Sequence, residues 1–234
     1  MNILNRTAIK SEAKNIISVN FNWLVMFFAE IVLILYNVFR SSILTLSKEY
    51  SWGYEKLLTT NPYITSVFFL MPIISLLVSP IFVAINGYYT NCLRTKNFSP
   101  GYVYQLAVMD YIKFIVVSFI KKFFLYLWGL LFIIPGIIKY YEYLMTEYII
   151  CDNPGMDATD AIRLSRKITK GYKFNLFLMQ ISFIPWYILT GITLGTAIIY
   201  VSPYVRTTQA MYYENLKRNA IEKNIATAKD FGEY

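Results

Sequence analysis

Four long apolar windows dominate the chain and restrict it to folds that enter or cross a membrane. They cover residues 21–39, 62–86, about 112–150 and 175–213. A helix needs roughly 20 apolar residues to cross a bilayer, so each of the last two windows is too long for one crossing. Only 15% of the residues are charged, against about 25% in a soluble domain. The sequence therefore predicts an all-α, polytopic membrane helix bundle.

Proline and glycine interrupt both long windows near their centres. Pro135 and Gly136 stand in FIIPGIIK, and Gly191 and Gly195 delimit GITLG. Proline disrupts helical hydrogen bonding, and glycine permits a sharp reversal of the chain. If Pro135–Gly136 only kinks a helix, the chain has four spans. If both sites are tight turns, two short helical hairpins raise the number to six.

The placement of Lys and Arg favours six spans. With four, the basic loop 151–175 would lie outside, against the tendency of basic residues to remain in the cytoplasm. With six, every strongly basic segment and both termini are cytoplasmic, and residues 40–61 form the sizeable external loop. The predicted spans are about 21–39, 62–86, 112–134, 137–151, 175–190 and 194–213, in one domain (1–213) followed by a polar cytoplasmic tail (214–234). The fourth and fifth are short for a full crossing.

Four ionisable residues form a candidate polar cluster inside the membrane: Glu30, Lys139, Glu142 and Glu147. Such groups are costly in lipid, so they must pair or face water. At 100° per residue, Lys139, Glu142 and Glu147 share one side of the fourth span. One interpretation is a salt-bridge network in which Lys139 pairs with Glu142 at i,i+3. Glu30 then pairs with a lysine of another span, such as Lys121, Lys122 or Lys139, or is protonated because it is buried. The other is a polar cavity for a cationic or amphipathic ligand. We prefer the first.

Residues 157–170 read as a short basic amphipathic helix at the cytoplasmic surface. Asp157 can cap its start, and Gly171 suits its end. Its basic face carries Arg163, Arg166, Lys167 and Lys170. The predicted role is contact with anionic lipid headgroups, with docking of a cytoplasmic partner as the rival. Nucleic-acid binding is not expected, because the topology accounts for the basic charge.

The residues that usually carry catalysis are scarce. The chain has no histidine, and its two cysteines, Cys92 and Cys151, are too far apart for a metal motif or a disulfide framework. We therefore predict no enzyme, no cofactor, no metal site and no catalytic residue.

Motifs after Trp128 carry a family resemblance. They include LLFIIPGIIK, YIICDNP, AIRLSR, KGYK and PYVRTTQAMYY. The chain resembles an uncharacterised integral membrane family of low-GC Gram-positive bacteria, the domain of unknown function 975. The resemblance implies a multi-span protein of the bacterial plasma membrane and brings no activity or catalytic residues. Pro185 stands where the family usually has glycine, so we expect a different bend in the fifth span.

Two functions remain open. The first is a non-enzymatic membrane protein that works through lipids, a membrane-protein partner or its own oligomer, as an accessory, assembly, envelope-stress or peptide-immunity component. The second is a small transporter or lipid-handling protein that uses a polar intramembrane cavity.

Overall fold

The structure is a computed structural model that describes residues 5–19, 22–49, 70 and 72–233. Every regular element in these ranges is a helix, which confirms the all-α class. The elements are α1 (Arg6–Ser18), α2 (Asn22–Glu49), α5 (Ser79–Thr95), α6 (Gly101–Met109), α7 (Tyr111–Leu131), α8 (Ile133–Glu142), α9 (Thr146–Asp152), α10 (Ala158–Thr169), α11 (Lys173–Ile181), α12 (Ile184–Ile192), α13 (Ile198–Glu222) and the 3₁₀ helix η2 (Ala228–Phe231).

Within the described residues, three helical stretches are long and apolar enough to cross a membrane: Pro72–Thr95, Tyr111–Leu131 and Lys173–Ile192. Only 17% of the residues in each of the last two are buried. Large apolar side chains such as Phe119, Phe123 and Ile192 are therefore exposed along them. An apolar surface of this extent is typical of a membrane-associated protein.

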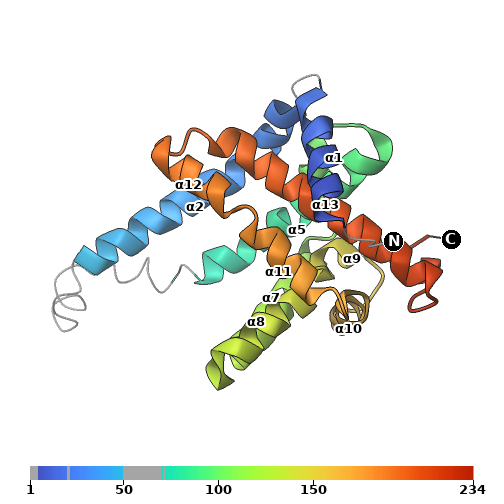
Figure 1. The fold of residues 1–234 in the computed structure, drawn as a ribbon. Coiled ribbons are helices and arrows are strands. Elements are labelled where there is room, and N and C mark those ends of the chain that lie inside the picture. Colours follow the sequence, from blue (N-terminus) through green and yellow to red (C-terminus); the bar gives the residue numbers. More distant parts are fainter. Residues whose placement is uncertain (1–4, 20–21, 50–69, 71, 234) are drawn as a thin grey trace.

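α5 and α13 form the centre of the molecule. α5 packs against α2, α6, α7, α9 and α13, and α13 also contacts α1, α2 and α12. Fully buried tyrosines fill this centre, among them Tyr88, Tyr89, Tyr212 and Tyr213. In Figure 1, the far end of α2 lies at the left, the α12–α13 turn at the upper left and the α7–α8 turn at the bottom, while α10 lies at the lower right and η2 at the right.

The helix boundaries agree with some predicted spans and differ from others. α7 corresponds to the third predicted span, and the helix of the second continues to Thr95. Residues 62–69 of that second span and 50–61 of the predicted external loop lie outside the described residues. The fourth span is interrupted between α8 and α9, and the fifth between α11 and α12, where Pro185 occupies the first turn of α12.

The predicted tail boundary at residue 213 is not a structural boundary. α13 continues through it to Glu222, and Leu216 and Ala220 are buried on its inner face. Phe231 in η2 is also buried. The prediction rested on the polar composition of this segment and overlooked the few apolar residues on one face, which pack against the bundle.

Both predicted reversals occur close to the expected residues. The chain turns at Phe132, which is extended (φ −160°, ψ 145°), so that Pro135 and Gly136 lie in the first turn of α8. Proline is tolerated there because the first helical N–H groups have no intrahelical partner. A Cβ at Gly136 would lie 3.2 Å from the Cα of Gly129, so the two helices pack backbone to backbone.

The second reversal uses left-handed backbone. Leu194 (φ 52°) and Gly195 (φ 90°) carry the chain from α12 to α13. Gly191 lies one residue before the end of α12, and a Cβ there would meet nothing within 4 Å. The two predicted hairpin glycines therefore differ, since only Gly195 needs glycine's conformational freedom.

We expect Gly136→Leu to lower the stability of the protein by about 1–3 kcal/mol, because the new side chain forces α7 and α8 apart. Gly191→Leu adds the same side chain in open space and is the matched control. Thermal melting in detergent gives the melting temperature of each variant. A thiol-reactive dye detects the transition, because it reacts with the buried Cys92 when the protein unfolds. Equal melting temperatures for the two variants would contradict the close helix contact.

Candidate functional site

Three clusters of charged and polar side chains connect the helices. We call them the interior network (Glu30, Asn86, Tyr89, Lys121, Glu147, Ser202 and Arg206), the Glu142 cluster (Lys139, Glu142, Arg166 and Lys173) and the Asp152 cluster (Arg94, Asp152, Tyr213, Glu214 and Lys217).

The interior network begins at Glu30, which is only 2% exposed to solvent. The hydroxyls of Tyr89 and Ser202 donate hydrogen bonds to its two carboxylate oxygens. The Arg206 Nε lies 4.0 Å from the Glu30 Oε1, and the Arg206 Nη1 donates to the Asn86 Oδ1 at 3.1 Å. Glu30 on α2 is thus connected to α5 and α13.

The same network continues from α5 to α9 and α7. The Asn86 Nδ2 donates to the Glu147 Oε2 at 2.7 Å, and the Lys121 Nζ lies 2.8 Å from the Glu147 Oε1. The predicted pairing of Glu30 with a lysine is therefore wrong, since its cation is Arg206. The prediction failed because the sequence does not show that α2 packs against α13, which it does.

The Glu142 cluster surrounds one carboxylate with three cations. The Lys139 Nζ lies 2.7 Å from the Glu142 Oε2, and the Lys173 Nζ and Arg166 Nε lie 2.5 and 3.4 Å from the carboxylate. The Ser165 hydroxyl on α10 donates to the backbone carbonyl of Glu142 at 2.7 Å. The predicted polar cluster is thus divided: Lys139 and Glu142 lie here, and Glu30 and Glu147 in the interior network.

The Asp152 cluster joins the cytoplasmic ends predicted for several helices, and sequence reasoning missed it. Arg94 binds the Asp152 carboxylate with both guanidinium Nη atoms, at 2.9 and 2.8 Å. The Lys217 Nζ and Tyr213 hydroxyl approach the same carboxylate at 2.7 and 2.8 Å. The sequence analysis used Asp152 only as part of the motif YIICDNP, because its partners Arg94 and Lys217 lie 58 and 65 residues away along the chain.

Burial and charge oppose each other in this cluster. Burial by itself would raise the pKa of Asp152, but the hydrogen bonds and charges of Arg94 and Lys217 outweigh it and hold that pKa below its usual value. Burial dominates at Glu214 and raises its pKa despite the neighbouring Arg94. Asp152 therefore remains ionised at neutral pH and holds α5, α9 and α13 together.

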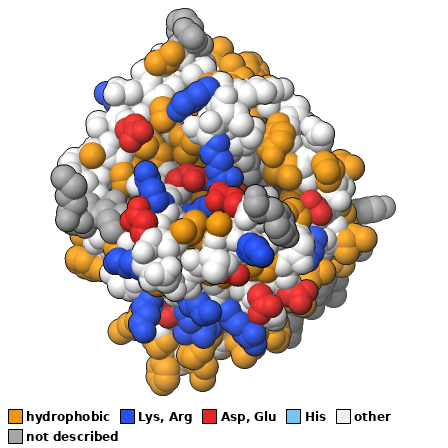
Figure 2. All heavy atoms as spheres, turned by 90° about the vertical axis from the view of Figure 1, so that its right-hand side faces the viewer, with side chains coloured by type: hydrophobic (Ala, Val, Ile, Leu, Met, Phe, Trp, Pro, Cys, Tyr) orange, Lys and Arg blue, Asp and Glu red, His pale blue; other side chains and the backbone are white. Residues whose placement is uncertain are grey.

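The predicted basic helix is present as α10. Its apolar residues Ala161, Leu164 and Ile168 are buried, and α10 packs against α7, α8, α9 and α13. The four predicted basic residues, Arg163, Arg166, Lys167 and Lys170, are all exposed. Lys and Arg side chains gather near the lower edge of the face in Figure 2, directly above hydrophobic side chains. α10 is therefore fixed to the bundle by its apolar face and presents its cations outward.

Two hollows border α10. A cleft of about 640 Å³ lies between its first turns and the C-terminal segment, with acidic and basic lining residues that include Asp157, Asp160, Lys167 and Lys229. A narrower groove of about 270 Å³ lies between α10 and α7. Its lining is Phe124, Trp128, Tyr143, Thr159, Ile162, Arg163 and Arg166. Among the described residues, no group of three or more His, Cys, Asp or Glu side chains is arranged to hold a metal ion.

These features define an all-helical, membrane-associated protein whose buried charges pair between helices. A family model described as "Protein of unknown function (DUF975)" matches residues 130–220. This is the family that the sequence motifs resemble, so the recognition is confirmed. The match extends from the end of α7 to the last turns of α13 and supplies no activity. No curated protein and no solved structure matches the chain.

We expect Asp152→Asn to destabilise the protein by about 3 kcal/mol, because the buried Lys217 ammonium then keeps only the exposed carboxylate of Glu233 as its partner. The folded pKa of Asp152 lies below the unfolded value of about 3.9, so this stabilisation is present at neutral pH and is lost only in acid. Unfolding in mixed micelles with increasing SDS gives the free energy of unfolding of the wild type and of the variant.

Asp160→Asn is the matched control, since it breaks a pair with Arg163 in which both side chains are exposed. Such a pair contributes under about 1 kcal/mol. If the two substitutions had equal effects, the Asp152 cluster would not be the helix clamp described above.

A double-mutant cycle tests the interior network. Glu147→Gln and Lys121→Gln should each destabilise by about 2 kcal/mol, because each leaves a charge unpaired among apolar helices. The double variant should lose at least about 1 kcal/mol less than the sum of the two, since no unpaired charge remains. The same SDS titration gives all four values. Additive effects would mean that the two side chains do not depend on each other.

Proposed function

We propose that this protein is a non-enzymatic, multi-pass protein of the bacterial plasma membrane that acts at the cytoplasmic membrane surface by binding anionic lipid headgroups through α10. The observation that carries the proposal is that the two faces of α10 have different roles. Its apolar face is fixed to the bundle, while Arg163, Arg166, Lys167 and Lys170 project outward beside the exposed apolar α7–α8 hairpin. Clustered cations next to a membrane-inserted segment attract anionic lipids.

The arrangement of the helices supports six membrane-inserted segments with both termini in the cytoplasm, because a hairpin that enters and returns leaves its two flanks on the same side of the membrane. The apolar turns of α7–α8 and α12–α13 lie at the bottom and at the upper left of Figure 1, away from the end of α13 at the right. α8 alone, with ten residues, rises about 15 Å, half of the hydrocarbon core. Trp128, four residues before the turn at Phe132, lines the groove beside α10, so the turn lies only about 6 Å along the helix beyond α10 and the hairpin enters the bilayer without crossing it.

The pairing of the interior charges supports an accessory or assembly role over transport. Glu30 and Glu147, which a transporter would use as binding groups, each already hold protein donors at hydrogen-bonding distance. Their contribution on this proposal is to fix five helices relative to one another. The lipid-bound cytoplasmic face then serves as the surface on which a membrane-protein partner, or a second copy of the chain, assembles in envelope-stress or peptide-immunity responses.

Cysteine labelling tests the topology. Leu194→Cys at the α12–α13 turn, where the side chain is 94% exposed, should react with a membrane-impermeant maleimide on intact cells. Asp157→Cys before α10 should react only after permeabilisation. The unmodified protein is the background control, because Cys92 is buried and Cys151 largely so. Labelling of Asp157→Cys from outside would overturn the proposed sidedness.

Lipid-dependent melting tests the binding itself. Phosphatidylglycerol added to the detergent-solubilised protein should raise the melting temperature more than the same amount of zwitterionic phosphatidylcholine, because only bound ligand stabilises the folded state. Replacing all four basic residues of α10 by Gln should remove this difference. If the quadruple variant keeps the full phosphatidylglycerol effect, α10 is not the lipid-binding surface.

A further inference from the structure

The groove between α7 and α10 has the chemistry of a specific lipid site. Resting on the function proposed above, we infer that this groove binds one anionic glycerophospholipid, with the phosphate between Arg163 and Arg166 and an acyl chain against Phe124 and Trp128. This goes beyond a diffuse attraction to headgroups, because it assigns one bound lipid to one place in the fold.

The floor of the groove is apolar and fixed in place. Ile162 is 4% exposed and Tyr143 is 1% exposed, so neither is free to move into the groove. Phe124 and Trp128, one helical turn apart on α7, form the opposite wall. A volume of about 270 Å³ is at the lower limit of small-molecule pockets and suits a slender apolar chain.

The mouth of the groove carries more positive than negative charge. Arg166 approaches Glu142 at 3.4 Å, but that carboxylate is already held more closely by Lys139 and Lys173. Arg163 is paired with Asp160 through one nitrogen at 3.0 Å and its side chain is 73% exposed. Each guanidinium has five N–H donors in a planar fork that suits a phosphate group, so both retain donors for a ligand.

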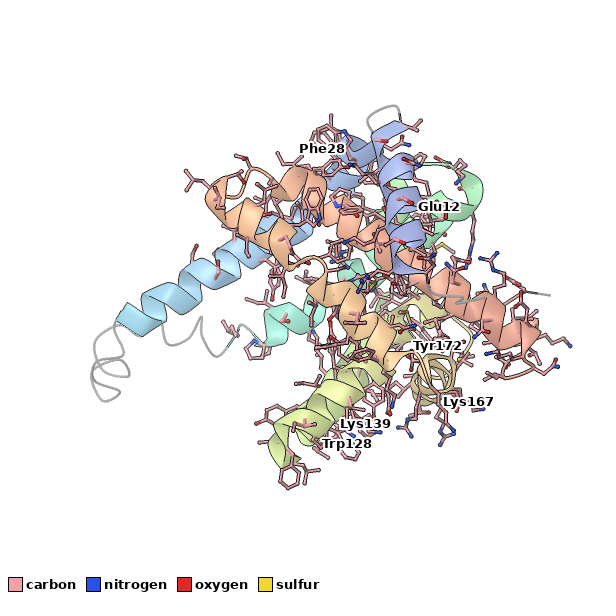
Figure 3. The ribbon with its side chains drawn as sticks, viewed as in Figure 1. Glu12, Phe28, Trp128, Lys139, Lys167 and Tyr172 are labelled. Carbon is pink, nitrogen blue, oxygen red and sulfur yellow. The ribbon has the colours of Figure 1, made fainter. Side chains whose placement is uncertain are left out.

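Aromatic contacts hold the cations at this mouth. The Arg166 Nη2 donates to the Tyr143 hydroxyl at 3.4 Å, and the Lys139 Nζ lies 4.8 Å from the centre of the Trp128 ring. Figure 3 shows Trp128 and Lys139 together on the α7–α8 hairpin, with Lys167 on the neighbouring α10. The charged mouth and the apolar wall are therefore parts of one site.

The surface beyond the groove is suited to the rest of a lipid. Phe119, Phe123 and Leu127 on the same helix are exposed, and Leu130 and Leu131 continue this apolar strip to the hairpin tip. A chain that leaves the groove along α7 therefore stays in contact with apolar side chains. A free phosphate ion would use only the two arginines and would gain nothing from Phe124 or Trp128.

Matched charge variants separate this site from diffuse attraction. The site pair Arg163→Gln/Arg166→Gln and the control pair Lys167→Gln/Lys170→Gln each remove two charges from exposed positions of α10. Native mass spectrometry of the protein with dioctanoyl phosphatidylglycerol counts bound lipids and gives the dissociation constant. We expect one tight lipid on the wild-type protein, a dissociation constant raised by about tenfold or more in the site pair, and a smaller rise in the control pair, which loses only general electrostatic attraction.

A third variant tests the apolar half without changing charge. Thr159 is exposed at the edge of the groove, and Thr159→Phe should fill it and displace the lipid as effectively as the site pair. Thermal melting checks that each variant is folded. Inorganic phosphate, added as a competitor, should displace the lipid only at concentrations far above that of the lipid itself.

Each other outcome rejects a defined part of the proposal. Equal losses in the site and control pairs would overturn the groove site while the anionic-lipid function survived as diffuse attraction. Unchanged lipid binding by Thr159→Phe, or phosphate competing as well as the lipid, would reduce the site to an anion site without an acyl chain. Absence of any preference for phosphatidylglycerol over phosphatidylcholine in the wild type would reject the proposed function itself.

Discussion

The fold depends on pairing charges that its apolar surroundings cannot solvate. An unpaired ion among apolar helices is strongly destabilising, so each buried carboxylate determines which helices can be neighbours. Glu30 needs Arg206, which brings α2 to α13, and Glu147 needs Lys121, which brings α7 to α9. Asn86 joins the two pairs through α5. One connected network thus orients five helices. Their apolar surfaces are similar to one another, so the charge pairs determine which helices become neighbours.

The Asp152 and Glu142 clusters extend the same logic to the side where α10 and the termini lie. Asp152 binds Arg94 and Lys217 and so fastens the ends of α5 and α9 to α13. Glu142 binds Lys139 and Lys173, and its carbonyl accepts from Ser165 on α10. α10 is therefore a rigid platform. Of its outward cations, Arg163 and Arg166 each have one carboxylate partner and retain further N–H donors, which are available to a ligand.

The local features were predictable from the sequence, and the partnerships were not. Helical periodicity and turn residues gave the all-α class, the reversals near Pro135 and Gly195, and the basic helix of residues 157–170 to within one residue at each end. The pair Lys139–Glu142 was predictable for the same reason, because residues three positions apart on a helix are neighbours. Partners such as Arg206 for Glu30 lie 176 positions apart, and only the packing of α2 against α13 brings them together. The break within the fifth span is local as well, because it lies directly before Pro185.

The central claim is that the protein works at the membrane surface through anionic lipids rather than through its polar interior. Purification from native membranes in mild detergent, with mass spectrometry of every co-purifying lipid and protein, tests it most directly. The account predicts near-stoichiometric anionic phospholipid, enriched over the composition of the bulk membrane. A lipid profile identical to that of the bulk membrane, together with a defined cationic or peptide ligand, would contradict the account and point to the interior network as the functional site.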